Sequence, residues 1–438
     1  MKKYFADYIL TSARSSGSIP AFINNGILTA DERIGNILSV KKIGKEKKEN
    51  SSTFAHTGFK TLIVPGFINA HTHSDLTFKP DKKTPRIFSQ WVLSLIEKRK
   101  SLNAEERINL RLKAYKKFIE SGTTAIGDII EPAYFCDFTH ILSRTSIFPR
   151  VKGFMELRGI DPSCAVQKIE EFKSFFKSNA EAFKKTERYF SLGISPHSVY
   201  SVSENLFREI LKANRKLKLK IAVHAAEHFS ETEFISGKGG DISEGLLPGI
   251  NLSKFSIPPN LFHSPISYLY SLKILSQNTS LIHSNEINAE DIDIIKKTGA
   301  SIIHCPRSNA FFKSKKLPLK NILEKGIPVS LGTDSLFSNK SLNFLDELLY
   351  AKKIHSDVKS KDLFYAATEG GAKALSFRGV TGTLEPGSYA DFTIFKIGSN
   401  AVLNKDNAYD AVISLKKKDI LGVAIGGNIV YKGPANLI

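Results

Sequence analysis

The alternation of apolar and polar positions divides the chain into a long central part and two ends. From Pro65 onward, short apolar runs alternate with amphipathic segments that have the three-to-four-residue spacing of helices. Eight of the apolar runs are typical of strands: 67–73, 123–129, 150–157, 189–197, 220–227, 280–284, 300–308 and 328–335. Strands separated by helices form parallel sheets, and eight of them predict a (β/α)8 barrel.

Two intervening segments carry clear helix signals, and a third is unusually long. Residues 104–120 follow Asn103, and Glu106 completes the spacing of a capping box. Residues 289–298 have the same amphipathic character. The segment 237–275, rich in Gly, Pro and Ser, is longer than a routine connection, and long segments in this position often act as lids.

The two ends of the chain are β-rich and contain no periodic helix. Short strand-like runs before residue 65 are broken by turn signals such as Asn24-Asn25-Gly26, and short strands return after Thr381. We predict that residues 1–64 and 382–438 pair into one small β domain beside a barrel of residues 65–381.

Composition narrows the class of protein. Hydrophobic residues make up 42% and charged residues 24% of the 438, and no run approaches the roughly 18–20 apolar residues of a membrane span. Asp7 interrupts the first apolar run, which argues against a secretory signal and favours the cytoplasm. Cys136, Cys164 and Cys305 form no CxxC pair, so any metal must be held by histidine and carboxylate.

The formal net charge of +19 raises the question of nucleic acid or an anionic membrane as a partner. The lysines, however, are scattered in small groups among polar residues, without interleaved aromatics. A solvated surface is the favoured interpretation, and we expect neither nucleic acid nor membrane as a partner. The sequence leaves the oligomeric state open, a homodimer included.

Candidate chemistry gathers at the ends of the predicted strands. His71 and His73 are separated by one residue, so both imidazoles point to one side. His224, His283 and Asp334 lie at the ends of the fifth, sixth and eighth predicted strands, where barrels of this kind assemble their active sites. Taken singly, these residues also fit a surface pair, a packed histidine and a helix-capping aspartate, but together they favour one metal site.

Several stretches resemble the amidohydrolase superfamily, in particular its branch of nucleoside, S-adenosylhomocysteine and guanine deaminases and triazine hydrolases. The resemblance rests on segments in the family's order along nearly the whole chain: VPGFINAHTHS, SPHSVYSVS, IAVHAAEHFSETEF, LIHSNEI, IIHCPRSN, LGTDSLFSNKSLNFLDELLYA, ATEGGAKAL and GTLEPGSYADFTIF. It implies a TIM-like barrel with a small β-sandwich built from both chain ends.

The resemblance also implies roles for individual residues. It places the ligands of the metal at His71, His73, His224 and Asp334. Glu227 matches the family's proton-shuttling acid and His283 its catalytic histidine. His197 stands where two-metal relatives have a carbamylated lysine, so the resemblance implies one metal and a substrate contact for His197.

A divalent metal held in this way can lower the pKa of bound water toward about 7 and so supply hydroxide. Asp334 can then accept the proton, His283 can orient the nucleophile, and Glu227 can protonate a ring nitrogen before ammonia leaves. Zinc is the first expectation for the metal; iron(II) and manganese suit the same ligands. The expected substrate is therefore a small heterocyclic amine.

Within the branch, the chain looks most like the aminodeoxyfutalosine deaminases of menaquinone biosynthesis. Their substrate resembles an adenosine carrying a carboxyphenyl ketone, so an apolar platform and a cation are expected. Trp91 is the candidate platform and Arg158 or Arg307 the candidate cation; a core residue and structural ion pairs are the alternatives. Asp75 departs from the Leu-Glu that follows HTH in many relatives and is a candidate contact for ribose hydroxyls.

The sequence leaves three alternative functions open. The same ligands fit a deaminase of S-adenosylhomocysteine, adenosine or guanine. They fit equally a hydrolase of triazines or cyclic amides. A catalytically inactive scaffold is a remote third interpretation.

Overall fold

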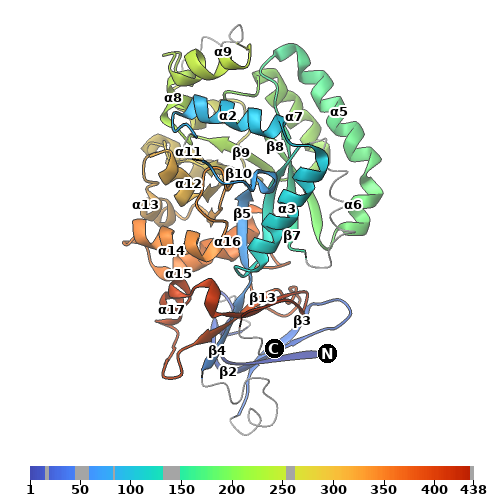
Figure 1. Ribbon diagram of the computed structural model, residues 1–438, viewed down its shortest axis with the longest axis vertical. Coiled ribbons are helices and arrows are strands. Elements are labelled where there is room, and N and C mark those ends of the chain that lie inside the picture. Colours follow the sequence, from blue (N-terminus) through green and yellow to red (C-terminus); the bar gives the residue numbers. More distant parts are fainter. Residues whose placement is uncertain (15–18, 45–58, 82–83, 132–147, 253–261, 435–438) are drawn as a thin grey trace.

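The computed structural model places the central part of the chain in a closed parallel barrel (Figure 1). It describes residues 1–14, 19–44, 59–81, 84–131, 148–252 and 262–434. The barrel strands are β5 (Phe67–Thr72), β6 (Thr123–Ile130), β7 (Arg150–Leu157), β8 (Phe190–Pro196), β9 (Ile221–Ala225), β10 (Thr279–His283), β11 (Ser301–His304) and β12 (Val329–Leu331). They lie in sequential order, and the amides of Thr333 and Asp334 donate to the carbonyl of His71, which joins the last strand to the first. All eight predicted strands are confirmed.

Helices surround the barrel, and the longer amphipathic ones pack an apolar face against it. The larger ones are α2 (Phe88–Lys100), α3 (Ala104–Ile119), α5 (Ala165–Ser178), α6 (Ala180–Thr186), α7 (Glu204–Leu217), α8 (Phe229–Ile235), α10 (Pro265–Ser271), α11 (Ala289–Thr298), α14 (Phe344–Ile354) and α15 (Ser360–Ala367). Helices of six residues or fewer are α9 (Leu247–Gly249), α12 (Pro306–Phe311), α13 (Leu319–Glu324) and α16 (Glu369–Ala374), and the seven-residue α17 (Ala408–Ser414) follows β13. The predicted capping box of α3 is present, since Asn103 and Glu106 hydrogen-bond reciprocally.

The two ends of the chain form one seven-stranded mixed sheet next to the barrel (Figure 1). Its strands are β1 (Lys2–Leu10), β2 (Phe22–Ala30), β3 (Ile37–Lys42), β4 (Lys60–Pro65), β13 (Phe392–Ile397), β14 (Ile420–Ile425) and β15 (Asn428–Lys432). The spatial order is β15-β14-β13-β4-β1-β2-β3, so β4 pairs with β13 from the far end of the sequence. This pairing confirms that both ends contribute to one β domain.

A single residue, Gly66, links the sheet to the barrel between β4 and β5. A Cβ atom at this position would lie 2.1 Å from the hydroxyl oxygen of Thr124, so the close passage requires glycine. Nearby, Arg150 of β7 forms a buried two-point ion pair with Asp391, with 2.5 Å between Nε and Oδ2 and 2.9 Å between Nη2 and Oδ1. These contacts fix the sheet against the base of the barrel.

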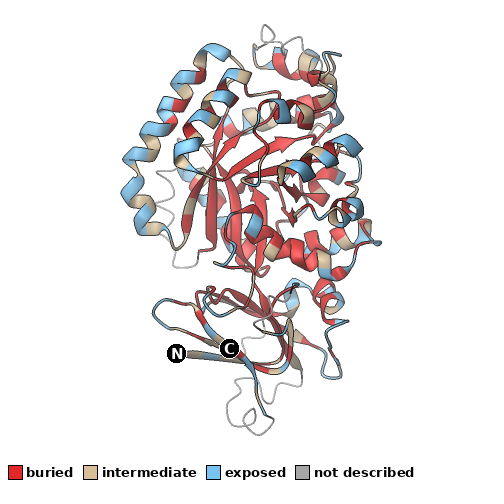
Figure 2. Cartoon of the chain, turned by 180° about the vertical axis from the view of Figure 1, so that it is seen from behind, coloured by how far each residue is buried: buried red, intermediate tan, exposed pale blue. Residues whose placement is uncertain are grey.

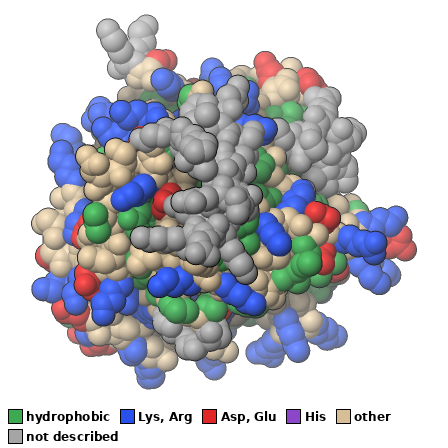
Figure 3. Space-filling model, turned by 90° about the horizontal axis from the view of Figure 1, so that it is seen from below, with side chains coloured by type: hydrophobic (Ala, Val, Ile, Leu, Met, Phe, Trp, Pro, Cys, Tyr) green, Lys and Arg blue, Asp and Glu red, His purple; other side chains and the backbone are tan. Residues whose placement is uncertain are grey.

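The barrel strands are buried, shown in red at the centre of Figure 2, whereas the outer faces of the helices are exposed and shown in pale blue. No helix in the described ranges is both long and apolar enough to span a bilayer. Lysine and arginine side chains are spread singly and in small groups over the lower face, among polar and apolar side chains (Figure 3). Cys136 and residues 253–261 of the segment 237–275 lie outside the described residues.

Candidate active site

The predicted histidines meet at the carboxyl ends of the barrel strands. His71 and His73 leave the end of β5 on the same side, because the intervening Thr72 points away and donates its hydroxyl to the carbonyl of Asp334 at 3.0 Å. His224 approaches from β9, and the ring centroids of His71 and His224 lie 4.9 Å apart. One candidate ligand atom from each of the three imidazoles lies within 4.8 Å of the other two.

Asp334 follows β12 and completes this group. Its Oδ1 atom lies 3.5 Å from Nε2 of His71 and 3.8 Å from Nε2 of His73. Its Oδ2 atom accepts hydrogen bonds from the hydroxyls of Ser308 and Ser338, both at 2.6 Å. One carboxylate oxygen is thus anchored, while the other faces the imidazoles. The residue has a φ of 56°, a strained conformation of the kind that concentrates at functional sites.

This donor set fits a divalent metal. The Nε2 atom of His71 is buried and has no hydrogen-bond partner, which is costly unless a ligand occupies its lone pair. Burial lowers the pKa of His71, His73 and His224, so their rings are neutral and able to coordinate. Nδ1 of His224 donates to the carbonyl of His197 at 3.1 Å, which leaves Nε2 free for the metal.

A second set of possible metal ligands lies close by but is poorly suited to bind another cation. Glu156, His197 and His224 offer ligand atoms within 4.8 Å of one another. However, Nη2 of Arg158 lies 2.5 Å from Oε2 of Glu156, and Nη1 of Arg99 lies 3.9 Å from the same oxygen. These two guanidinium groups already balance the carboxylate, so the geometry favours a single ion.

Glu227 and His283 face each other beside the four candidate ligands, with 3.5 Å between Oε1 and Nε2. Nδ1 of His283 donates to Oδ1 of Asn309 at 3.0 Å, which leaves Nε2 unprotonated and facing Glu227. Burial and the negative charge of Asp334 raise the pKa of Glu227 well above its usual value. The raised pKa favours the protonated form of the Glu227 carboxyl, which can act as a proton donor.

The turn that carries Glu227 is held by Glu231, which the sequence-based prediction did not include. The Glu231 carboxylate accepts hydrogen bonds from the backbone amides of Ala226 at 3.1 Å, Glu227 at 2.7 Å and His228 at 3.4 Å. It is fully buried, and Ala226 is held at a φ of 54°. The Glu231 side chain therefore positions Glu227. The available sequence signal was the capping-box spacing of three residues between His228, the N-cap of α8, and Glu231.

Removing this support is expected to misplace Glu227 without removing the metal ligands. An alanine at position 231 should lower kcat by about 10- to 100-fold, as for other residues that orient a catalytic group. Glu231→Gln should lose less activity than Glu231→Ala, because the glutamine oxygen can still accept from the amides of Glu227 and His228, whereas its NH2 group cannot accept from Ala226. Metal content and kcat measured on both variants test this; equal losses of kcat in the two would contradict it.

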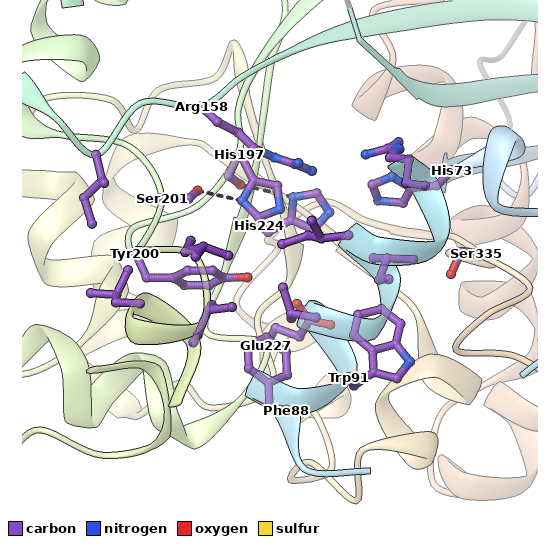
Figure 4. Close-up of a pocket in the computed structure, with 18 of the residues that line it drawn as sticks. His73, Phe88, Trp91, Arg158, His197, Tyr200, Ser201, His224, Glu227 and Ser335 are labelled. Atoms are coloured by element: carbon purple, nitrogen blue, oxygen red, sulfur yellow. Dashed lines mark hydrogen bonds between the residues drawn. The ribbon is translucent and has the colours of Figure 1, made fainter. Parts of the chain in front are cut away.

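A cavity of about 290 Å³ opens above these residues. Its walls include the predicted substrate contacts His197, Trp91 and Arg158, together with Tyr200, which was not predicted (Figure 4). The remaining walls are largely apolar and come from α2 and from the segment 237–275: Phe88, Val92, Leu95, Ile96, Leu246, Leu247, Ile250 and Leu252. The described part of that segment thus forms a wall of the cavity; its closure as a lid stays a prediction.

Two predicted substrate contacts are not brought to this cavity. Asp75 has no exposed surface, and its Oδ2 accepts from Nε and Nη2 of Arg99 at 3.1 and 2.8 Å. Burial would raise the pKa of Asp75, but Arg99 and Arg111 hold it below the usual value.

Arg307 points toward Ser341 and the carboxylates of α14 and lies in the wall of another cavity. Asp75 and Arg307 are therefore structural ion-pair residues, and Arg99 instead lies in the wall of the candidate site.

Known proteins resemble this chain along most of its length. A model of the amidohydrolase family matches residues 62–430. The aminodeoxyfutalosine deaminase of Nitratiruptor sp. is 30% identical over 81% of this chain and 83% of its own. The 5-methylthioadenosine/S-adenosylhomocysteine deaminase of Thermodesulfovibrio yellowstonii is 25% identical over 97% and 92%.

A similar fold is known from a crystal structure. The aminofutalosine deaminase of Helicobacter pylori in complex with methylthio-coformycin superposes with a TM-score of 0.78 at 22% identity, covering 98% of this chain and all of that one. The present chain belongs to the amidohydrolase family and is a hydrolase that acts on carbon–nitrogen bonds.

Proposed function

We propose that this protein is a metal-dependent aminohydrolase that releases ammonia from a 6-aminopurine nucleoside. The observation that carries the proposal is the convergence of three imidazoles and one carboxylate beside Glu227 in a largely apolar cavity. The deaminase relatives at 25% and 30% identity support it.

His71, His73, His224 and Asp334 would hold the metal, for which zinc is the first choice and iron(II) or manganese the alternatives. When bound, the metal would lower the pKa of a water molecule so that a nucleophile is available at neutral pH. The candidate ligands are buried, and the cavity above them has largely apolar walls.

The remaining steps belong to side chains of the chain itself. Glu227 donates its carboxyl proton to a ring nitrogen of the purine, which makes the neighbouring amino-bearing carbon electrophilic. Nε2 of His283 accepts a hydrogen bond from the attacking water and orients it. Oδ1 of Asp334 takes up the proton that the water loses and passes it to the amino group, which leaves as ammonia. The hydroxyl left on the attacked carbon then gives its proton back to Glu227 as the carbonyl of the product forms.

For the substrate itself, aminodeoxyfutalosine in menaquinone biosynthesis is our first choice. Trp91 has 7% of its surface exposed and packs against Phe312, so it offers a rigid aromatic wall for the purine or the aryl group. The Arg158 side chain is 39% exposed and reaches the cavity, where its guanidinium suits a carboxylate. A 5-methylthioadenosine or S-adenosylhomocysteine substrate is the alternative that the relatives support.

Ammonia release by the metal-loaded enzyme from aminodeoxyfutalosine, 5-methylthioadenosine, S-adenosylhomocysteine, adenosine and guanine tests this proposal. Arg158→Met should reduce kcat/KM for carboxylate-bearing substrates by about 10- to 100-fold, the value of a lost charged hydrogen bond, and leave adenosine unaffected. Arg208→Met on the exposed face of α7 is the matched control. Turnover of triazines or cyclic amides alone would favour another hydrolase of the family, and no turnover with no bound metal would favour an inactive scaffold.

A further inference from the structure

Two lysines lie inside the base of the barrel, at the end opposite the candidate active site. Lys152 of β7 is two residues before Phe154, and Lys220 is two residues before Ala222 of β9. Phe154 and Ala222 belong to the apolar cluster that fills the barrel interior. Because side chains two residues apart on a strand point the same way, both lysines are directed into the barrel.

Both side chains are buried without a counter-charge. Lys152 is 7% exposed and Lys220 is 4% exposed, and no carboxylate in the described part of the chain forms an ion pair with either. Nζ of Lys220 donates to the carbonyl of Gln277 at 3.3 Å, whereas Nζ of Lys152 lies 5.4 Å from the ring centroid of Phe377. Lysines are almost never this buried unless they are paired.

Lys152, Lys220 and Lys373 bring three amino groups close together at the base of the barrel. Burial lowers the pKa of Lys152 to about 8. Burial, followed by repulsion from Lys152 and the exposed Lys373, lowers the pKa of Lys220 to about 8 as well. Burial and mutual repulsion thus disfavour the cationic forms of the two lysines, and a nearby anion would favour them.

Hydroxyl groups line the same level of the barrel. Ser191 of β8 is the register partner of Lys152, and its buried Oγ has no hydrogen-bond partner. Ser280 and Ser301, which pair across β10 and β11, share a hydrogen bond of 2.8 Å between their hydroxyls. Ammonium and hydroxyl groups are the donors that a tetrahedral oxyanion accepts.

We infer that the base of the barrel is a binding site for a small oxyanion such as inorganic phosphate, held by Lys152, Lys220 and the hydroxyl of Ser191. A bound oxyanion compensates both buried charges and gives the Ser191 hydroxyl its missing acceptor. The inference is independent of the proposed deamination, because these residues lie at the other end of the strands from Glu227 and Asp334.

Equilibrium dialysis of the full-length, metal-loaded enzyme against radiolabelled phosphate tests the site. One phosphate should bind per chain, with sulfate as a competitor. Lys152→Met and Lys220→Met should each weaken binding by about 10-fold or more, since each removes a charged hydrogen bond. Lys320→Met on the exposed face of α13 should leave the affinity unchanged.

Methionine retains the length and apolar stem of lysine, so the two variants should stay folded, which their thermal unfolding and unchanged turnover will show. The absence of saturable phosphate binding to the unaltered enzyme would overturn the inference. Equal affinities in the three variants would overturn it as well.

Discussion

An Asp334→Asn enzyme is expected to lose about 10²- to 10⁴-fold in kcat/KM, the range observed when a positioned acid–base group is removed. The amide is isosteric with the carboxylate and can keep an oxygen toward Ser308 and Ser338. It supplies no negative charge to the group of imidazoles and cannot accept the proton lost by water. Ammonia release and metal content, measured on the same preparation, separate the proton-transfer role from the ligand role.

Asp346→Asn is the matched control for this variant, because Asp346 is half exposed on α14 near the rim of the barrel. It should have the activity of the unaltered enzyme. An Asp334→Asn enzyme that turns over at full rate would contradict the assignment of Asp334 as both ligand and proton acceptor.

A Glu227→Gln enzyme is expected to lose about 10²- to 10⁴-fold in kcat while its metal content stays the same. The physical reason is that Glu227 is buried, carries a raised pKa and faces His283 and not the imidazoles of the ligand set. Glutamine matches the size and neutrality of the protonated acid but has no acidic proton to transfer. Substrate binding should therefore change little, and the loss should appear in kcat far more than in KM.

Glu290→Gln, on the exposed face of α11, is the control for this substitution. Loss of the metal from Glu227→Gln would assign Glu227 to the coordination sphere instead. Unchanged kcat would remove Glu227 from the proton-transfer scheme altogether.

Asp334→Asn and Glu227→Gln act on neighbouring atoms, so their effects are not expected to add. Both belong to one proton path from water to the purine ring, and interrupting it twice costs little more than interrupting it once. A double variant should therefore be close in rate to the slower single variant.

The sequence by itself determined the barrel, because strand and helix periodicities are local properties of the chain. It also indicated His71, His73, His224, His283 and Asp334, since the carboxyl end of a barrel strand is recognisable from the strand alone. The contribution of both chain ends to one β domain followed from their shared β-rich pattern.

The tertiary structure alone decided which charged residues face the substrate cavity. Arg158 and Arg307 follow strands in the same way, yet one reaches the cavity and the other is turned toward the carboxylates of α14. Asp75 is close in sequence to the candidate ligands but is buried against Arg99, twenty-four residues further along. Ion pairs between distant segments leave no periodic trace in a sequence, because they depend on how helices pack around the barrel.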